Sequence, residues 1–373
     1  MKPLIKWTGG KYREIKILEK FLPNKYKFYI EPFFGGGALF FHLQPSKAFI
    51  NDISTELMCF YKYLKELNQK FKSELEKLAS FWDFFPTTVL IENIYPYFEK
   101  AYKAENGFFN KNTIKFFVNE TIKNPQLTEI IVNNIENKLQ RLLAILNKEK
   151  RIFNSDELKQ HLETAIRSGI YNYYRGKLNS FPKNFCSEEK IAIWWCIREL
   201  CYGSMFRFSK NGKFNIPYGG ISYNRKKLLP KVEYLFQQKV ISLLKRAEIF
   251  CMDFEDFLKK VNPSREDFVF LDPPYDTKFK DYNGITFSQR DHIRLANLLS
   301  KLPAKWLLVI KKTDFILDLY SDMENIYIIS YKKNYSYNVR GRNFRTAEHL
   351  IITNYPPSSE KTINKYLFPQ KRT

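Results

Sequence analysis

The spacing of hydrophobic residues divides the chain into two ends that predict strands alternating with helices and a middle that predicts helices alone. Short β-branched and aromatic runs at residues 27–31 and 48–52 are each followed by a helical pattern, which is typical of a βαβ opening. Further strand-like runs occur at residues 248–253, 267–272, 305–311, 325–331 and 347–353. Seven strands interleaved with helices predict an α/β fold whose mostly parallel sheet is covered on both faces.

The middle of the chain has a different pattern. From Leu57 to Trp82 apolar residues recur at helical spacing, which predicts one long helix. Residues from about 60 to 190 keep this helical character and are rich in lysine and asparagine. We therefore expect a sheet domain made of residues 1–59 and 240–373, with a mainly helical domain inserted at residues 60–239.

Composition indicates the kind of partner. The 373 residues include 61 basic and 39 acidic side chains, a net charge of +22, and 44% of the residues are hydrophobic. This hydrophobic content is too high for a disordered basic tail, so we expect a folded protein that is attracted to polyanions. The alternative explanation of the positive charge is the lysine-rich and asparagine-rich composition that an AT-rich genome produces.

The same residues argue against several other classes of protein. No apolar run approaches the roughly 20 residues of a membrane span, and the amino terminus lacks the hydrophobic region of a signal peptide. Five cysteines without CxxC spacing and only four histidines support neither a disulfide scaffold nor a metal site. We therefore expect no membrane association, no metal, reduced thiols and a cytoplasmic location.

A glycine-rich turn follows the first predicted strand. It runs from Glu31 through Phe33 to Gly35 and Gly37 and precedes a helical pattern. Glycines let a ligand approach the backbone, and a helix amino terminus offers N–H groups to an anion. A plain turn between strand and helix explains the motif equally well. Its spacing differs from the dinucleotide fingerprint, whereas a carboxylate-bearing nucleoside such as S-adenosylmethionine fits.

Four further side chains are candidates for a nucleoside site. Asp52 ends the second predicted strand, where a carboxylate can bind ribose hydroxyls, although helix capping shared with Ser54 is an alternative. Trp7 could stack on an adenine ring while Lys11 meets a carboxylate, and a core tryptophan beside a solvated lysine is the alternative. Asp253 closes the third strand, where contact with adenine and an ordinary strand-end acid are nearly equal readings.

The motif that decides the chemistry is Asp272-Pro273-Pro274-Tyr275, which follows four apolar residues. The exocyclic amine of adenine is a poor nucleophile because its lone pair is delocalised into the ring. If Asp272 and the Pro273 carbonyl accept the two amino hydrogens, the lone pair can point at an electrophilic methyl group. Prolines suit this site because they lack an N–H donor, and Tyr275 offers a face on which a flipped base can stack.

These motifs resemble the Dam-like DNA adenine-N6 methyltransferases, of the D12 class and alpha group. Residues 6–11 are similar to the amino-terminal cofactor motif of that family, residues 31–37 to its glycine loop and residues 272–275 to its catalytic motif, in the same order. Residues 202–209 and 212–219 resemble the hairpin with which the family reads DNA. The resemblance implies a Rossmann-like methyltransferase sheet with an inserted DNA-recognition domain whose hairpin lies at about residues 200–220.

The resemblance also implies roles for individual residues. The expected catalytic residues are Asp272, Pro273, Pro274 and Tyr275. The expected cofactor-binding residues are Trp7, Lys11, Glu31, Phe33, Gly35, Gly37, Asp52, Asp253 and Asp272. The expected DNA-binding residues are Tyr202, Met205, Arg207, Pro217, Arg340 and Arg342, of which the last two lie in a run that an exposed loop explains equally well.

The sequence departs from the family at several positions. Gly203 and Ser209 stand where Dam-like hairpins carry asparagines, and Gly220 stands where they carry an arginine, so a GATC target does not carry over. Lys311 and Lys312 replace small polar residues after a strand, which affects one wall of the expected pocket. Residues from about 68 to 162 match no part of the family pattern.

The expected function is transfer of a methyl group from S-adenosylmethionine to adenine N6 in a short sequence of duplex DNA, after the base is flipped. We expect a nucleoid-associated monomer, either solitary or accompanied by a cognate restriction endonuclease. An RNA adenine-N6 methyltransferase is one alternative, although the hairpin would then be unexplained. A catalytically silent DNA-binding subunit is another, and the intact motif at residues 272–275 argues against it.

Overall fold

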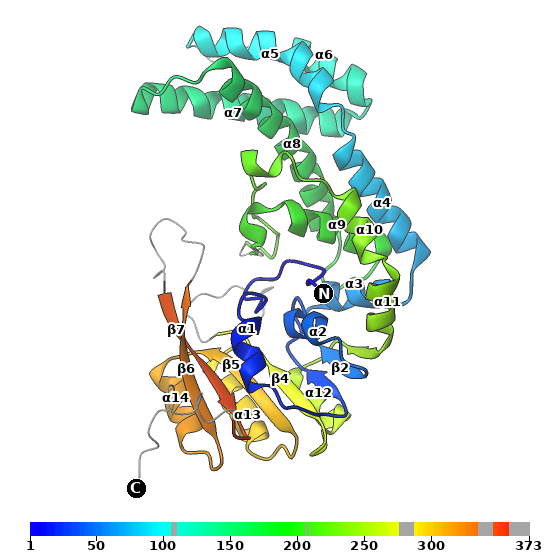
Figure 1. The fold of residues 1–373 in the computed structure, drawn as a ribbon. Coiled ribbons are helices and arrows are strands. Elements are labelled where there is room, and N and C mark those ends of the chain that lie inside the picture. Colours follow the sequence, from blue (N-terminus) through cyan, green and yellow to red (C-terminus); the bar gives the residue numbers. More distant parts are fainter. Residues whose placement is uncertain (106–109, 206, 210, 276–286, 335–345, 358–373) are drawn as a thin grey trace. The chain divides into compact units, whose positions relative to one another are not determined.

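A computed structural model describes the chain except residues 106–109, 206, 210, 276–286, 335–345 and 358–373 (Figure 1). Contacts divide it into one unit made of Met1–Glu66 with Gln238–Thr373 and a second unit made of Leu67–Gln237. The division falls inside the segment that hydrophobic spacing predicted to be a single long helix, and that prediction is wrong. Helix α3 (Thr55–Lys65) and helix α4 (Gln69–Asp83) are separate, because Leu67 has a left-handed φ of 53° and Asn68 caps α4.

The first unit contains a seven-stranded sheet with the order β3-β2-β1-β4-β5-β7-β6 (Figure 1). All pairs from β3 through β5 are parallel, whereas β7 is antiparallel to both β5 and β6. The predicted α/β fold with a mostly parallel seven-stranded sheet is therefore confirmed. The strands are β1 (Tyr29–Glu31), β2 (Ala48–Asn51), β3 (Ala247–Phe250), β4 (Phe268–Leu271), β5 (Lys305–Lys311), β6 (Tyr327–Asn334) and β7 (Thr346–Thr353).

Alternating side chains give the sheet two apolar faces. On one face Ile30 of β1 and Val269 of β4 pack in a core with residues of α12, α13 and α14. On the other, Tyr29 contacts Phe40 of α2, with their ring centroids 6.2 Å apart. The helical elements of this unit are α1 (Ile15–Leu18), η1 (Glu19–Phe21), α2 (Ala38–Leu43), α3, α11 (Gln238–Lys245), α12 (Phe254–Val261), α13 (Gln289–Leu299) and α14 (Asp314–Ser321).

The second unit is helical, and asparagine side chains begin several of its helices. Asn68, Asn110, Asn124 and Asn154 each accept a hydrogen bond from a backbone N–H of the first helical turn, which satisfies a donor that has no partner within the helix. The described residues of the unmatched stretch from about 68 to 162 therefore form helices, several of which begin with an asparagine cap. The helical elements are α4, α5 (Thr87–Lys103), α6 (Lys111–Ile122), α7 (Pro125–Glu149), α8 (Ser155–Ser180), α9 (Glu188–Leu200), η2 (Tyr202–Ser204), η3 (Ile221–Tyr223) and α10 (Leu229–Leu235).

The segment at residues 200–220 doubles back on itself beside α8. Antiparallel bridges join Cys201 to Tyr218 and Phe208 to Phe214. The side chain of Asn179 in α8 makes two hydrogen bonds to the backbone of Phe214. Its amide donates to the Phe214 carbonyl at 3.0 Å, and its oxygen accepts the Phe214 N–H at 2.8 Å. The segment is therefore fastened to a long helix.

Three cysteines carry free thiols, namely Cys196, Cys201 and Cys251. Within the described part of the chain, no helix is both long enough and apolar enough to cross a membrane.

Candidate active site

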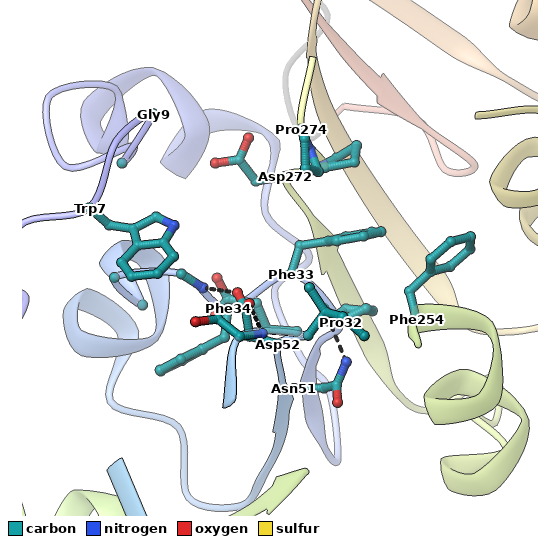
Figure 2. Close-up of a pocket in the computed structure, with 18 of the residues that line it drawn as sticks. Trp7, Gly9, Pro32, Phe33, Phe34, Asn51, Asp52, Phe254, Asp272 and Pro274 are labelled. Atoms are coloured by element: carbon teal, nitrogen blue, oxygen red, sulfur yellow. Dashed lines mark hydrogen bonds between the residues drawn. The ribbon is translucent and has the colours of Figure 1, made fainter. Parts of the chain in front are cut away.

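A single pocket in the first unit brings together every predicted catalytic and cofactor-binding residue (Figure 2). It lies where β1, β2 and β4 end and where α12 begins, as expected for ligands of an open α/β sheet. Figure 2 shows Phe33 between Trp7 and Phe254, with the Asp272 carboxylate on the same side of the pocket as Trp7. The predicted residues that line it are Trp7, Lys11, Glu31, Phe33, Gly35, Gly37, Asp52, Asp253, Asp272, Pro273, Pro274 and Tyr275.

The glycine loop is shaped by its contact with Trp7. Gly35 and Gly37 have left-handed φ values of 50° and 62°, which glycine adopts without strain. A Cβ atom on Gly35 would lie 2.7 Å from Cδ1 of the Trp7 indole, and one on Gly37 would lie 2.4 Å from the Phe34 ring. Side chains are therefore excluded at both positions by the protein itself, and Trp7 is seated on the loop with part of its ring exposed.

Two neighbouring polar residues hold the loops at the strand ends. Buried Asn51 donates to the carbonyls of Pro32 and Met252 and accepts the Met252 N–H at 3.0 Å, so it ties the loop after β1 to the loop after β3. Asp52 accepts the N–H of Gly35 at 2.8 Å and that of Ser54 at 2.9 Å. These two bonds hold the loop backbone ahead of α3, which begins at Thr55, and the half-buried Asp52 carboxylate also lines the pocket.

An aromatic group forms another part of the pocket. The Phe33 ring lies 5.3 Å from the ring of Phe254 and 5.6 Å from that of Phe287, measured between centroids. Arg294 lies 4.9 Å from the Phe254 ring centroid and pairs with Asp253 at 2.8 Å. Asp253 also accepts the Glu255 N–H as the N-cap of α12, three residues after β3 ends at Phe250.

Lys11 connects the amino-terminal segment to the catalytic motif. Its ammonium donates to Asp272 Oδ1 at 2.5 Å, to the Tyr275 hydroxyl at 2.9 Å and to the Gly9 carbonyl at 3.1 Å. Lys11 is only 2% exposed, whereas the Asp272 side chain is 19% exposed and faces the pocket. Three acceptors use the three hydrogens of the ammonium group. The carboxylate that Lys11 meets in this structure is Asp272.

The protonation equilibria of the site follow from burial and neighbouring charge. Burial raises the pKa of Asp272, and the positive charge of Lys11 opposes this rise. Burial also lowers the pKa of Lys11, but Asp272, Tyr275 and Glu14 together outweigh it and leave that pKa raised. Burial raises the pKa of Glu31 well above its usual value, and its hydrogen bond from Tyr29 opposes this only in part. Lys11 therefore stays protonated and places a positive charge beside Asp272.

Sequence reasoning missed several residues of the pocket. Asn51 precedes the singled-out Asp52, and its part in joining two loops shows only when β2 and β3 are side by side. Phe254 directly follows Asp253 and could have been found from that adjacency. Phe287 directly precedes the N-cap of α13 and Asp291 lies in its first turn, and no motif marked either residue.

The predicted DNA-binding residues that the structure describes line no part of this pocket. Tyr202, Arg207 and Pro217 are exposed and Met205 is partly exposed in the second unit. The Arg207 guanidinium donates to the Asn215 side chain at 3.4 Å across the doubled-back segment. Arg340 and Arg342 lie outside the described residues.

The fold and the pocket define the class: an α/β enzyme with an Asp-Pro-Pro-Tyr motif and a glycine loop at one sheet edge. A model of the D12 class N6 adenine-specific DNA methyltransferase family matches residues 7–117 and 114–336, so the chain belongs to that family. It is an adenine-specific DNA methyltransferase, and the predicted family and activity are confirmed.

Curated relatives carry corresponding names. The chain is 27% identical over 362 residues to type II methyltransferase M.CviBI of Paramecium bursaria Chlorella virus NC1A, covering 95% of this chain and 100% of the relative. It is 25% identical over 369 residues to type II methyltransferase M1.LlaDCHI of Lactococcus lactis subsp. cremoris, with 95% and 96% covered. It is 19% identical over 309 residues to the DNA adenine methylase of Haemophilus influenzae, with 81% and 75% covered.

Proposed function

We propose that this methyltransferase takes its methyl group from S-adenosylmethionine and transfers it to N6 of an adenine flipped out of duplex DNA. One observation carries the proposal: Asp272 and Tyr275 line the same pocket as the glycine loop and the acidic strand ends. A target base and a cofactor bound there would meet at Asp272. The proposal is finer than the family assignment, which supports adenine methylation of DNA.

The residues present in the pocket fit the proposed cofactor. Trp7, Phe33 and Phe254 line the pocket and offer aromatic faces to an adenine ring, and Asp52 offers a carboxylate to ribose hydroxyls. The carboxyl groups of Asp52 and Asp272 give the pocket an acidic character that suits a sulfonium cation. When bound, S-adenosylmethionine supplies an electrophilic methyl group. Asp253 is engaged with Arg294, so we assign it the weaker role of setting the position of α12 and Phe254.

The catalytic motif is suited to holding an amine. Pro273 and Pro274 present carbonyls without N–H donors, so nothing from their backbone repels the amino hydrogens of the base. In our proposal Asp272 and the Pro273 carbonyl accept these hydrogens, and the base stacks on Tyr275. The contact between Lys11 and Asp272 supports a role for Lys11 in keeping that carboxylate ionised and oriented. We therefore assign Lys11 to Asp272 rather than to the cofactor's carboxylate.

The segment at residues 200–220 is our candidate for reading the DNA sequence. Exposed Tyr202, Arg207 and Pro217 support this assignment, because base edges can be read only by accessible side chains. We retain Met205 for apolar contact and Arg340 and Arg342 for phosphate contacts as predictions from the sequence. A cognate restriction endonuclease, a monomeric state and a cytoplasmic, nucleoid-associated location are proposals of the same kind.

The test is a methyl-transfer assay with purified protein, labelled S-adenosylmethionine and duplex DNA. We expect methylated adenine in the product and no detectable turnover after Asp272→Ala, while DNA affinity persists because phosphate contacts dominate it. The matched control is Asp256→Ala, which removes an exposed acid of α12 outside the pocket. Substantial turnover by the Asp272 variant, or a preference for RNA of the same sequence, would contradict the proposal.

A further inference from the structure

A second charged group lies behind the catalytic motif, and neither the family match nor the motifs assign it. Glu14 is 5% exposed and accepts hydrogen bonds from two residues of β6, the Tyr331 hydroxyl and the Lys333 ammonium. The Lys333 contact measures 2.6 Å, and the Lys333 side chain is also largely buried. Glu14 therefore takes part in a buried, hydrogen-bonded ion pair rather than in a solvent-exposed one.

Glu14 fastens the segment that carries Lys11. The Glu14 N–H donates to the Lys11 carbonyl at 2.8 Å, so the two residues belong to one tight turn before α1. The Glu14 side chain then ties that turn to β6, which is joined through β7 and β5 to β4, the strand that ends beside Asp272. The contact therefore fixes the turn relative to the catalytic carboxylate.

The group is also balanced in charge. It contains two cations, Lys11 and Lys333, and two anions, Asp272 and Glu14. Glu14 raises the pKa of Lys11, whereas the charge of Lys11 lowers the pKa of Lys333. Without Glu14, two buried cations would compete for the single carboxylate of Asp272.

We propose that Glu14 is a positioning residue for methyl transfer, which holds Lys11 and, through it, the Asp272 carboxylate in the orientation that accepts the amine of the target base. The inference rests on the proposed role of Asp272. Glu14 lines no part of the pocket, so it acts only through Lys11 and Lys333. The alternative is a purely structural role, in which Glu14 stabilises the fold and has no effect on methyl transfer.

The two roles differ in their effect on the pH profile. The ionisable groups that act on Asp272 are Lys11, Tyr275, Glu14 and Lys333, with Glu31, Tyr331 and His349 close to the same group. Glu14 raises the pKa of Asp272 and Lys333 lowers it. Because activity requires ionised Asp272, Glu14→Gln should move the acid limb of the profile to lower pH. Lys333→Met should move the limb to higher pH.

The experiment compares Glu14→Gln and Lys333→Met in the full chain. Their matched controls are Glu19→Gln, an exposed acid a few residues away, and Lys332→Met, the exposed neighbour on β6. We expect kcat to fall roughly ten- to a hundredfold in both test variants, as for a misplaced catalytic group. KM for DNA and cofactor should stay within about twofold, since the pocket lining is unchanged. The acid limbs should shift in opposite directions.

Thermal melting identifies variants that fail to fold. If Glu14→Gln does not fold, Tyr331→Phe replaces it in the comparison of kcat, because it removes only the hydroxyl that donates to Glu14 and keeps the Glu14 charge. Folded variants with wild-type kcat, or with acid limbs that move in the same direction, would overturn the inference. If Asp272→Ala is inactive while Glu14→Gln and Lys333→Met behave as wild type, only the positioning role fails. If Asp272→Ala retains turnover, the proposed function fails instead.

Discussion

Two glycines of helix α8 provide an internally matched test of packing in the helical unit. Gly169 faces α7, where an added Cβ would lie 2.6 Å from Cγ1 and 2.9 Å from Cα of Ile131. Gly176 is two turns further along α8, and an added Cβ would meet nothing within 4 Å. The same substitution, glycine to alanine in one helix, therefore separates the effect of a close backbone contact from that of helix propensity.

The magnitudes follow from two opposing effects. Alanine stabilises a helix interior by about 0.5–1 kcal/mol relative to glycine, and this gain applies to both positions. At Gly169 the neighbour includes a backbone atom, which cannot rotate away, so overpacking should cost about 1–3 kcal/mol. We expect Gly176→Ala to raise the free energy of unfolding and Gly169→Ala to lower it.

The assay is urea unfolding monitored by circular dichroism, which gives the free energy of unfolding. Hydrogen exchange of the peptides from α7 and α8 then measures the local stability of the two helices. Gly169→Ala should speed exchange in both helices, whereas Gly176→Ala should leave it unchanged or slower. A Gly169 variant as stable as the Gly176 variant would refute the close contact between α7 and α8. It would also weaken the argument that a firmly packed α8 supports the segment at residues 200–220.

Three further predictions concern the pocket, the DNA-reading segment and pH. Trp7→Ala should raise the dissociation constant for S-adenosylmethionine by one or two orders of magnitude, since a lost stacking face removes about 1–3 kcal/mol; unchanged affinity by calorimetry would exclude that role. Arg207→Ala should weaken binding to the specific DNA site by about 1–3 kcal/mol and relax the preference for one guanine. An equal loss of binding affinity for cognate and random duplexes would instead indicate a phosphate contact. Burial lowers the pKa of His349 to about 3 from 6.5, so this residue is neutral in the fold and takes up a proton on unfolding at lower pH. The contribution of His349 to the free energy of unfolding is therefore lost as pH falls below about 6.5, by up to about 1.4 kcal/mol per pH unit. His349→Gln should flatten this part of the curve of stability against pH.

The sheet and the pocket residues could be predicted because both depend on local patterns. Each strand was marked by a short apolar run, and parallel strands bring their carboxyl ends to one edge, so Asp52, Asp253 and Asp272 had to lie near one another. The periodic pattern failed at Leu67, where apolar spacing continues across a break that depends on one left-handed residue and on the cap at Asn68. Hydrophobic spacing reports which side of a helix is buried and carries no signal for such a break.

The partners of charged side chains were the least predictable feature. Lys11 and Asp272 are separated by 261 positions in the sequence, and Glu14 and Lys333 by 319. Either lysine could have been solvated, which is the commoner fate of this residue type. Only the fold, which places β6 and the amino-terminal turn together, decides that both are buried and paired.

The glycine loop shows why a motif can be found for a reason that is only part of its physics. In the sequence, Gly35 and Gly37 suggested a backbone that a ligand approaches closely. In the fold, the atoms that forbid a side chain there belong to Trp7 and Phe34. Loss of activity in a Gly35→Ala variant would therefore not demonstrate cofactor contact, because the substitution must displace Trp7 first. Trp7→Ala combined with Gly35→Ala separates the two effects: if the double variant binds cofactor no worse than Trp7→Ala alone, Gly35 acts by seating the indole.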